Sequence, residues 1–423
     1  MRFFFILFFV ALIVKSIKRN GLMSTYTFFL LFSMFFMFSR FIFDIFGYAD
    51  VLKITFPANH SVKAESGIAV IFLCFLVYTL IDIGFFGSRI IILKEKEISV
   101  SSNVYKSLLA ILLITLPLII YKNYLRFKYV QSVGYIEYTL NPDDIKFPFF
   151  LSGIGWIFNV SFWALIICSG KKHDTKFLWC LYLIVSLLDS LKGNRAAFSI
   201  NFVIAVYFLI KKSKMSVKKT VKILSIVLIL FISFYLVATN LREANSDKNG
   251  FKFNFFQDIL ISLFYSQSVS LNIPLLYMDF FNSTLRDSSV PFVFADYLNF
   301  CLNVDVFDTG VLLQKLLPAP KGFGLGYSFL VEIFDLKIFA IPFCMFIGSF
   351  IKFVEKNFFR NDYFVGFFCL FFMSIIYMPR HIFFDFISPI RISWILCGMF
   401  LIFMFCDLFR RNKFLQNGEK IKC

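Results

Sequence analysis

Long apolar runs separated by short charged segments make up most of the chain. Eleven of them approach the length of a helix that crosses a lipid bilayer, which needs about 20 apolar residues. They fall near residues 3–14, 22–43, 67–87, 104–121, 148–169, 177–189, 196–210, 221–239, 337–351, 363–378 and 392–409. The alternation of polar and apolar residues that marks membrane β-barrels is not seen. The pattern therefore predicts an all-α, polytopic helical membrane protein with about 11 transmembrane helices, the first of them uncleaved.

Composition supports the same fold class. The 423 residues are 59% hydrophobic and only 16% charged, which excludes an ordinary water-soluble globular protein. We expect a single polytopic membrane domain over residues 1–423. The 65 phenylalanines are scattered over every run, and the nine cysteines have neither metal-site spacing nor the pattern of a disulfide framework.

The net charge of +17 has a positional explanation. Alternate short loops and the C-terminal tail hold 24 Lys and Arg residues, whereas the opposite short loops hold 10. Because cytoplasmic loops are enriched in Lys and Arg, we predict that the first set faces the cytoplasm. This accounts for the positive charge without nucleic acid as a partner.

The longest polar segment, residues 240–336, is then expected outside as a large extracytoplasmic loop. Apolar residues at helical spacing around 256–264 predict an amphipathic helix on the membrane surface, and a second is expected through 292–302. Two further spans hidden in this segment would leave the orientation unchanged, and one would invert everything after it.

A charged turn interrupts the apolar runs at Asp189–Phe198, with the sequence DSLKGNRAAF. It fixes Lys192 and Arg195 near a membrane surface, where their side chains can reach a ligand. The alternative is a positively charged turn that extends to lipid headgroups.

The charge count places further polar residues on the same outer face. They are Arg242, Glu243, Arg286, Lys321, Glu332, Arg380, His381, Asp385 and Arg391. Positively charged residues normally gather on the cytoplasmic face, so a group of arginines on the outer face indicates an anionic ligand there. Guanidinium groups match phosphate oxygens bidentately. Gly322, Gly324 and Gly326 would let backbone approach that ligand, although an ordinary loop before a helix explains them equally well.

Two other side chains are candidates for proton transfer. His381 could act as a base, or be a hydrogen-bonded structural residue at a helix end. Glu332 follows an apolar stretch just before a span, where an uncompensated carboxylate is costly, so an arginine or a substrate hydroxyl is implied as its partner.

Three motifs carry a resemblance to a known family. The LKGNRAAFSI turn, the segment GFGLGYSFLVEIF that ends the long loop, and Arg380-His-Ile-Phe resemble the landmarks of bacterial oligosaccharide repeat-unit polymerases, the Wzy-type O-antigen polymerases. The resemblance covers nearly the whole chain in topology. Arg195, Gly324, Gly326, Glu332 and Arg380 stand where the family has its arginines, glycines and carboxylate. After Arg380, His381-Ile382 replaces the small residues usual in the family.

The resemblance implies a membrane glycosyltransferase that polymerises undecaprenyl-diphosphate-linked oligosaccharide units, without a metal or cofactor. It implies catalytic roles for Arg195, Arg380 and Glu332 and substrate binding at Gly324 and Gly326. The polar residues on the outer face add the other expected substrate-binding residues, which are Lys192, Arg242, Arg286, Lys321, His381 and Arg391. The expected location is the bacterial inner membrane, with the active site on the periplasmic or extracellular side. Membrane lipids, a chain-length regulator and a flippase are the other expected partners.

Two alternatives remain open at this point. An O-antigen ligase would use the same donor with a lipid A-core acceptor, and the sequence hardly separates it from a polymerase. A lipid-linked oligosaccharide flippase belongs to a different class. A flippase needs charges along a path through the bundle and usually has repeated halves, which this sequence lacks.

Overall fold

The computed structural model describes residues 1–47, 50–54, 60–134, 147–170, 174–191, 195–213, 218–226, 270–280, 328–381 and 389–419, and the single positions 138, 145, 229 and 233. For residues 195–197, 389 and 411–419 the backbone alone is described. The predicted surface helices around 256–264 and 292–302 lie outside the described residues.

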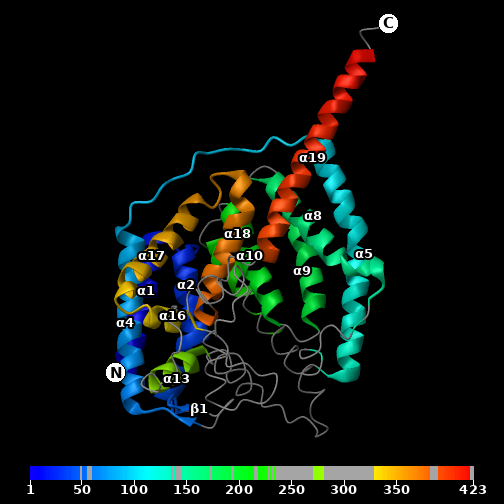
Figure 1. Ribbon diagram of the computed structural model, residues 1–423. Coiled ribbons are helices and arrows are strands. Elements are labelled where there is room, and N and C mark those ends of the chain that lie inside the picture. The colour runs from blue at the N-terminus through cyan, green and yellow to red at the C-terminus, as the bar shows by residue number, and fades with distance from the viewer. Residues whose placement is uncertain are drawn as a thin grey trace. The chain divides into compact units, whose positions relative to one another are not determined.

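The described part of the chain consists almost entirely of helices, which confirms the all-α, multi-pass prediction (Figure 1). Seven helical segments in it are long and apolar enough to cross a membrane: Thr25–Ile45, Ala64–Gly87, Ser102–Val133, Phe149–Ser169, Lys337–Asn357, Asp362–Arg380 and Ile390–Arg410. Helices α1 (Arg2–Asn20), α9 (Lys176–Ser190) and α10 (Arg195–Ser213) stand at three more of the predicted runs. The run at 221–239 lies largely outside the described residues, so the count of eleven spans stays a prediction.

Residue contacts divide the chain into two compact units. The first comprises Met1–Ile92, Phe251–Glu355 and Phe372–Phe386, and the second Leu93–Gly250, Lys356–Phe371 and Ile387–Cys423. Helix α18 (Val365–Tyr377) contributes residues to both. The expectation of one membrane domain over residues 1–423 stays a prediction.

The first unit is built on three long helical segments near the N-terminus. Helix α1 packs against α2 (Thr25–Ser33), α3 (Ser39–Ile45) and α4 (Ala64–Gly87) (Figure 1). A π-helical stretch, η1 (Met34–Phe38), joins α2 to α3 within one span. Such π-helical insertions in α-helices are frequent at functional sites, which makes this stretch a candidate functional region of the unit.

Phenylalanine rings form the contacts between these helices. The Phe5 ring of α1 lies 4.7 Å from Phe38 and 4.9 Å from Phe75, centroid to centroid, and Phe9 lies 4.8 Å from Tyr78. All three pairs meet edge to face, an arrangement that aromatic rings prefer. Part of the abundant phenylalanine is therefore used for packing one helix against another.

Two glycines let α4 approach α17 (Ala340–Asn357) closely. A Cβ atom at Gly84 would lie 2.2 Å from the backbone oxygen of Met345, and one at Gly348 would lie 2.1 Å from that of Ile81. Neither backbone oxygen can move aside without shifting its helix. Small residues at a helix crossing are typical of membrane bundles, in which tight backbone approach replaces the hydrophobic driving force of soluble proteins.

Short elements cover one end of this unit. A two-stranded hairpin, β1 (Lys53–Ile54) and β2 (His60–Ser61), pairs antiparallel with Ile54 opposite His60. The short helix α13 (Asn272–Phe280) packs on α4 and on α16 (Phe329–Asp335). The unit also contains η5 (Lys337–Phe339) and η7 (Met378–Arg380). Residues 270–280, from the long segment predicted to be an outer loop, are thus part of the packed unit.

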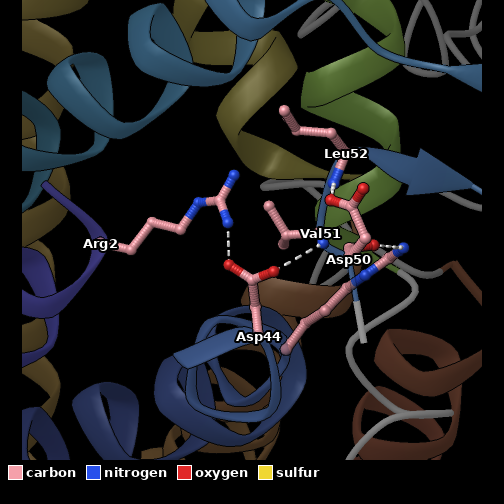
Figure 2. A network of polar contacts seen from close by, with 6 residues as sticks. Arg2, Asp44, Asp50, Val51 and Leu52 are labelled. Carbon is pink, nitrogen blue, oxygen red and sulfur yellow. Dashed lines mark hydrogen bonds and ion pairs between the residues drawn. The ribbon is translucent and has the colours of Figure 1, made fainter. Parts of the chain in front are cut away.

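The hairpin end also carries a polar network. Figure 2 shows Arg2 pointing towards Asp44, whose carboxylate also accepts a hydrogen bond from the backbone N–H of Val51 at 3.2 Å. Asp50 accepts one from the backbone N–H of Leu52 at 2.9 Å. The network fixes the start of α1 and the end of α3 to the segment that leads into β1.

The second unit is a bundle around α8 (Ile154–Ser169). Helix α5 (Ser102–Val133) and helix α19 (Pro389–Glu419) pack on α8, while α9 packs on α5 and α10. The Phe162 ring of α8 stacks on Tyr182 of α9 at 4.0 Å. At Gly398 of α19 a Cβ would lie 3.0 Å from the backbone nitrogen of Ala164, so this crossing is also close. The short elements are α7 (Phe149–Ser152) and η6 (Asp362–Phe364).

Helix α5 differs from its sequence prediction. The apolar run ends near residue 121, and Lys122, Arg126 and Lys128 were therefore expected in a loop. The structure extends the helix through all three residues to Val133, where Gly134 ends it at a positive φ of 90°. At 1.5 Å per residue, its 32 residues span about 48 Å, well over the thickness of a bilayer core.

Polar contacts group the helix ends within each unit. In the first, Lys15 pairs with Asp82 at one end of α1, and Arg2 with Asp44 at the other. In the second, contacts at both ends of α5 do the same. Before α5, Lys96 exchanges backbone hydrogen bonds with Arg360 and Asp362, and in the last turns of α5 Arg126 approaches Asp189. Each contact therefore joins segments that the Lys and Arg count assigns to the same side of the membrane. The side that faces the cytoplasm stays a prediction.

Candidate functional site

Arg380 ends the span that contains α18. Pro379 lacks the N–H that an α-helix requires, and the chain tightens there into the 3₁₀ turn η7, with the backbone N–H of His381 donating to Met378 O at 3.1 Å. The Arg380 guanidinium lies over the Phe36 ring, 5.6 Å from its centroid. His381 stacks on Tyr377 at 5.5 Å. Arg380 is thus half-buried against the π-helical stretch of the neighbouring span.

Glu332 lies in the first turn of α16 and is only 3% exposed. A carboxylate is favoured there because the free N–H groups of a helix start carry partial positive charge. Helix α16 packs against η7, which contains Arg380. The structure therefore brings Glu332 and Arg380 onto contacting elements of one unit, although 48 positions separate them in the sequence.

The same unit contains a buried arginine that the sequence analysis missed. Arg40 of α3 is 3% exposed, and its guanidinium donates to Asn272 Oδ1, to Lys53 O at 2.6 Å and to Asp50 O at 3.3 Å. It joins α3, the hairpin and the start of α13. A charged residue near the end of an apolar run is the signal that could have identified it, because ionisable groups in such runs are costly and usually functional.

At the opposite end of α13, His60 and Asp279 form a pair that the sequence analysis also missed. His60 Nε2 lies 2.7 Å from Asp279 Oδ2, and the Asp279 side chain is only 4% exposed. The sequence shows His60 as an isolated loop residue, and its partner lies 219 positions further along. No local spacing could have predicted this pair.

The second unit contains Arg195 and Arg391. Arg195 is the first residue of α10, so the last four residues of the predicted turn, 195–198, are helical, and the side chain of Arg195 is not described. Asp189 of the same turn lies 3.7 Å from Arg126 of α5. Arg391 is half-buried in the first turn of α19. It lies close enough to the Tyr182 hydroxyl of α9 to interact with it electrostatically, as does Asp189. These residues therefore gather at one end of the unit.

Several predicted site residues lie outside the described part of the chain. They are Lys192, Arg242, Arg286, Lys321, Gly324 and Gly326, together with Asp385. Arg195 and Arg380 belong to different units. The roles expected for all of these residues stay predictions.

The chemistry available in the first unit combines a cation with a buried carboxylate. The Arg380 guanidinium makes a cation–π contact with Phe36, and guanidinium N–H groups are donors that bind phosphate oxygens. A carboxylate on the adjoining element can accept a proton from a hydroxyl group. Such a pair suits a reaction in which an anionic group leaves as a hydroxyl attacks.

Comparison with protein families gave a match over almost the entire chain. The family described as O-antigen polysaccharide polymerase Wzy matches residues 1–310 and 312–413. Comparisons with curated proteins and with solved structures gave no match. A match of this extent, on a chain with several membrane-spanning helices, establishes the family. The chain therefore belongs to the O-antigen polysaccharide polymerase Wzy family.

Proposed function

We propose that the chain transfers a growing oligosaccharide from undecaprenyl diphosphate to a fresh carrier-linked repeat unit, at the outer leaflet of the bacterial inner membrane. As a member of its family, the chain is a glycosyltransferase-like polymerase of O-antigen repeat units, and it is a multi-pass membrane protein. The carrier, the leaflet and the residue roles are the parts that this proposal adds.

The proposed reaction exchanges one bond for another at an anomeric carbon. The bond between that carbon and the donor diphosphate breaks, and a bond to the hydroxyl oxygen of the acceptor's non-reducing-end sugar forms. The hydroxyl proton passes to a base, and undecaprenyl diphosphate leaves with the bonding electron pair. Negative charge thus builds on the diphosphate while the hydroxyl loses its proton.

Each charge change has a candidate residue. Arg195 and Arg380 would stabilise the leaving diphosphate, because guanidinium donors become more effective as negative charge develops in a site that excludes water. Glu332 would remove or orient the hydroxyl proton, with His381 as the other candidate base. In this proposal the chain's own cations perform the electrostatic task, without a metal. Lys192, Arg242, Arg286, Lys321, Gly324, Gly326 and Arg391 would bind the rest of the substrate.

One observation supports these roles more than any other. Helix α16, which contains the buried Glu332, packs against η7, which contains Arg380. A base and a phosphate-binding cation on contacting elements suit a reaction in which proton removal and diphosphate departure are coupled. The outer location of the active site rests on the Lys and Arg count of the loops.

The two alternatives are less well supported. The family match is to a polymerase and extends over nearly the whole chain, which favours neither an O-antigen ligase nor a flippase. Loss of a polymerase, a ligase or a flippase would each cause a different product to accumulate.

Deletion of the gene in its own host tests the proposal. We expect surface lipid that carries a single repeat unit instead of a ladder, with the ladder restored by the wild-type chain. Loss of all surface repeat units, with long polymer accumulating on the carrier, would indicate a ligase. Carrier-linked single units trapped at the cytoplasmic leaflet would indicate a flippase.

A further inference from the structure

Helix α5 changes character where its apolar run ends. Residues 107–121 are almost entirely apolar, and Lys122, Asn123, Arg126 and Lys128 follow on the same continuous helix. Because the helix is longer than a bilayer core requires, its cations begin near the depth at which the hydrocarbon ends. This is the depth at which the diphosphate of a membrane-bound polyprenyl lipid lies.

Two of these cations make cation–π contacts with the same aromatic ring. Lys122 Nζ lies 5.1 Å from the centroid of the Phe147 ring, and the Arg126 guanidinium lies 5.3 Å from it. The two residues are four positions apart on the helix, where like charges destabilise each other. The ring offsets part of that repulsion, and an anion between the two side chains would offset it further.

Lys122 does not behave as a lysine that extends to lipid headgroups. It is 6% exposed, and its Nζ donates to Ser152 O at 2.8 Å. A snorkelling lysine directs its ammonium group into the interface instead. Burial of a charged group at such a site is costly, and membrane proteins that accept this cost generally use the charge.

Arg126 is partly exposed, and its ion pair with Asp189 is a long one. Its contact with Asp189 Oδ1 measures 3.7 Å, longer than the roughly 2.8 Å of a charge-assisted hydrogen bond, and its side chain is 28% exposed. Asp189 lies at the C-terminal end of α9, which packs on α10, the helix that begins at Arg195. Arg126 thus lies at the end of the unit that presents the predicted donor-binding arginine.

We propose that Lys122 and Arg126, held against Phe147, form a binding site for the diphosphate group of a polyprenyl-linked substrate. The proposal rests on the proposed function for the identity of the lipid. It adds two cations on α5 to the donor site and assigns to Phe147 the role of setting their spacing. An anionic phospholipid headgroup offers similar phosphate chemistry and is the competing occupant.

Binding of geranylgeranyl diphosphate to the purified full chain in nanodiscs of phosphatidylcholine tests this site. We expect Arg126→Ala and Arg126→Lys each to weaken binding about tenfold or more, because the guanidinium fork is lost. Lys122→Met should do the same. Lys128→Ala is the matched control, because Lys128 is an exposed cation half a turn further along the same helix. The affinity of this variant for the diphosphate should stay within about twofold of wild type.

The outcomes separate the possible occupants. Selective loss of diphosphate binding in the Arg126 variants supports the site, even if Lys122→Met proves unstable. Equal affinity in wild type and both Arg126 variants contradicts it. A second set of nanodiscs containing phosphatidylglycerol tests the headgroup. If the phospholipid abolishes diphosphate binding to wild type at equimolar amounts, the site binds headgroups and the proposal is wrong. Wild-type protein that binds no prenyl diphosphate would contradict the proposed donor itself.

Discussion

His60 of the hairpin and Asp279 of α13 form a contact between Nε2 and Oδ2 at 2.7 Å. The other carboxylate oxygen of Asp279 accepts hydrogen bonds from the backbone N–H of Lys63 at 3.1 Å and from the Ser66 hydroxyl at 3.0 Å. Arg40 binds Asn272 at the opposite end of the same helix. Helix α13 is therefore attached at both ends to the elements that surround the hairpin.

The first prediction concerns the pH dependence of this attachment. Burial raises the pKa of Asp279, but the hydrogen bonds from His60, Lys63 and Ser66 lower it by more, so the folded value lies below the ordinary one. A lowered pKa stabilises the fold above the unfolded value of about 4, and the contribution is lost as the pH falls through the folded value. Asp279→Asn should lower the unfolding temperature near neutral pH, by an amount equivalent to about 1 kcal/mol.

Thermal unfolding of the detergent-solubilised protein between pH 3 and pH 7 measures this effect. The difference between wild type and Asp279→Asn should shrink as the pH falls below about 4, the ordinary carboxyl value. Parallel profiles over the whole range would show that the Asp279 carboxylate does not carry the attachment.

The second prediction concerns the crossing of α4 and α17. Gly348→Ala would place a methyl group 2.1 Å from Ile81 O, and a backbone oxygen cannot move aside without shifting the helix. We expect a loss of about 1–3 kcal/mol of stability and less protein in the membrane. Gly87→Ala on α4 is the matched control, because nothing lies within 4 Å of its added Cβ. Equal unfolding temperatures for the two variants would contradict the close crossing.

The sequence predicted the helical fold well because long apolar runs have few other stable structures in a membrane. It also selected Glu332 and Arg380, which the structure places on contacting elements. The extension of α5 was missed because its apolar run stops at residue 121, although the absence of Pro and Gly from 122 to 133 favours continuation of the helix.

Other features depend on tertiary contacts that no local pattern contains. Helix α13 is only nine residues long and lies within a mainly polar segment, and its burial is set by α4 and α16. Asn272, which binds Arg40, and Asp279, which binds His60, each lie more than 200 positions from their partner. Charge and burial cost could identify Arg40 as unusual, but only the fold identifies its partners.

The third prediction concerns Glu332. Glutamine keeps nearly the same shape but cannot accept a proton, so Glu332→Gln should shorten or abolish the polymer ladder at a normal level of protein. A fall in activity of about a hundredfold is expected for a lost general base. Immunoblotting of membranes alongside the ladder separates this effect from misfolding. A normal ladder would contradict proton transfer and leave Glu332 a structural role in α16.

The fourth prediction concerns orientation. The difference of 24 to 10 in Lys and Arg predicts that the 211–222 loop and the C-terminus lie inside and that residues 240–336 lie outside. Alkaline phosphatase fused near Ser288 should be active, and the same enzyme fused after Lys413 should be inactive. The reverse result would place the proposed site on the cytoplasmic side, where the flipped substrate is absent.

Reconstitution of the purified chain with undecaprenyl-diphosphate-linked repeat units is the most direct test of the proposed polymerase. We predict a ladder of products on the carrier from the wild type. Arg195→Ala and Arg380→Ala should each reduce its formation about a hundredfold, with the Lys variants intermediate, because charge without the guanidinium fork stabilises the leaving diphosphate less. Arg410→Ala, which removes an exposed arginine at the end of the last membrane-spanning segment, should leave the ladder intact. Folded wild-type protein that forms no ladder, or full ladders from both Ala variants, would contradict the account.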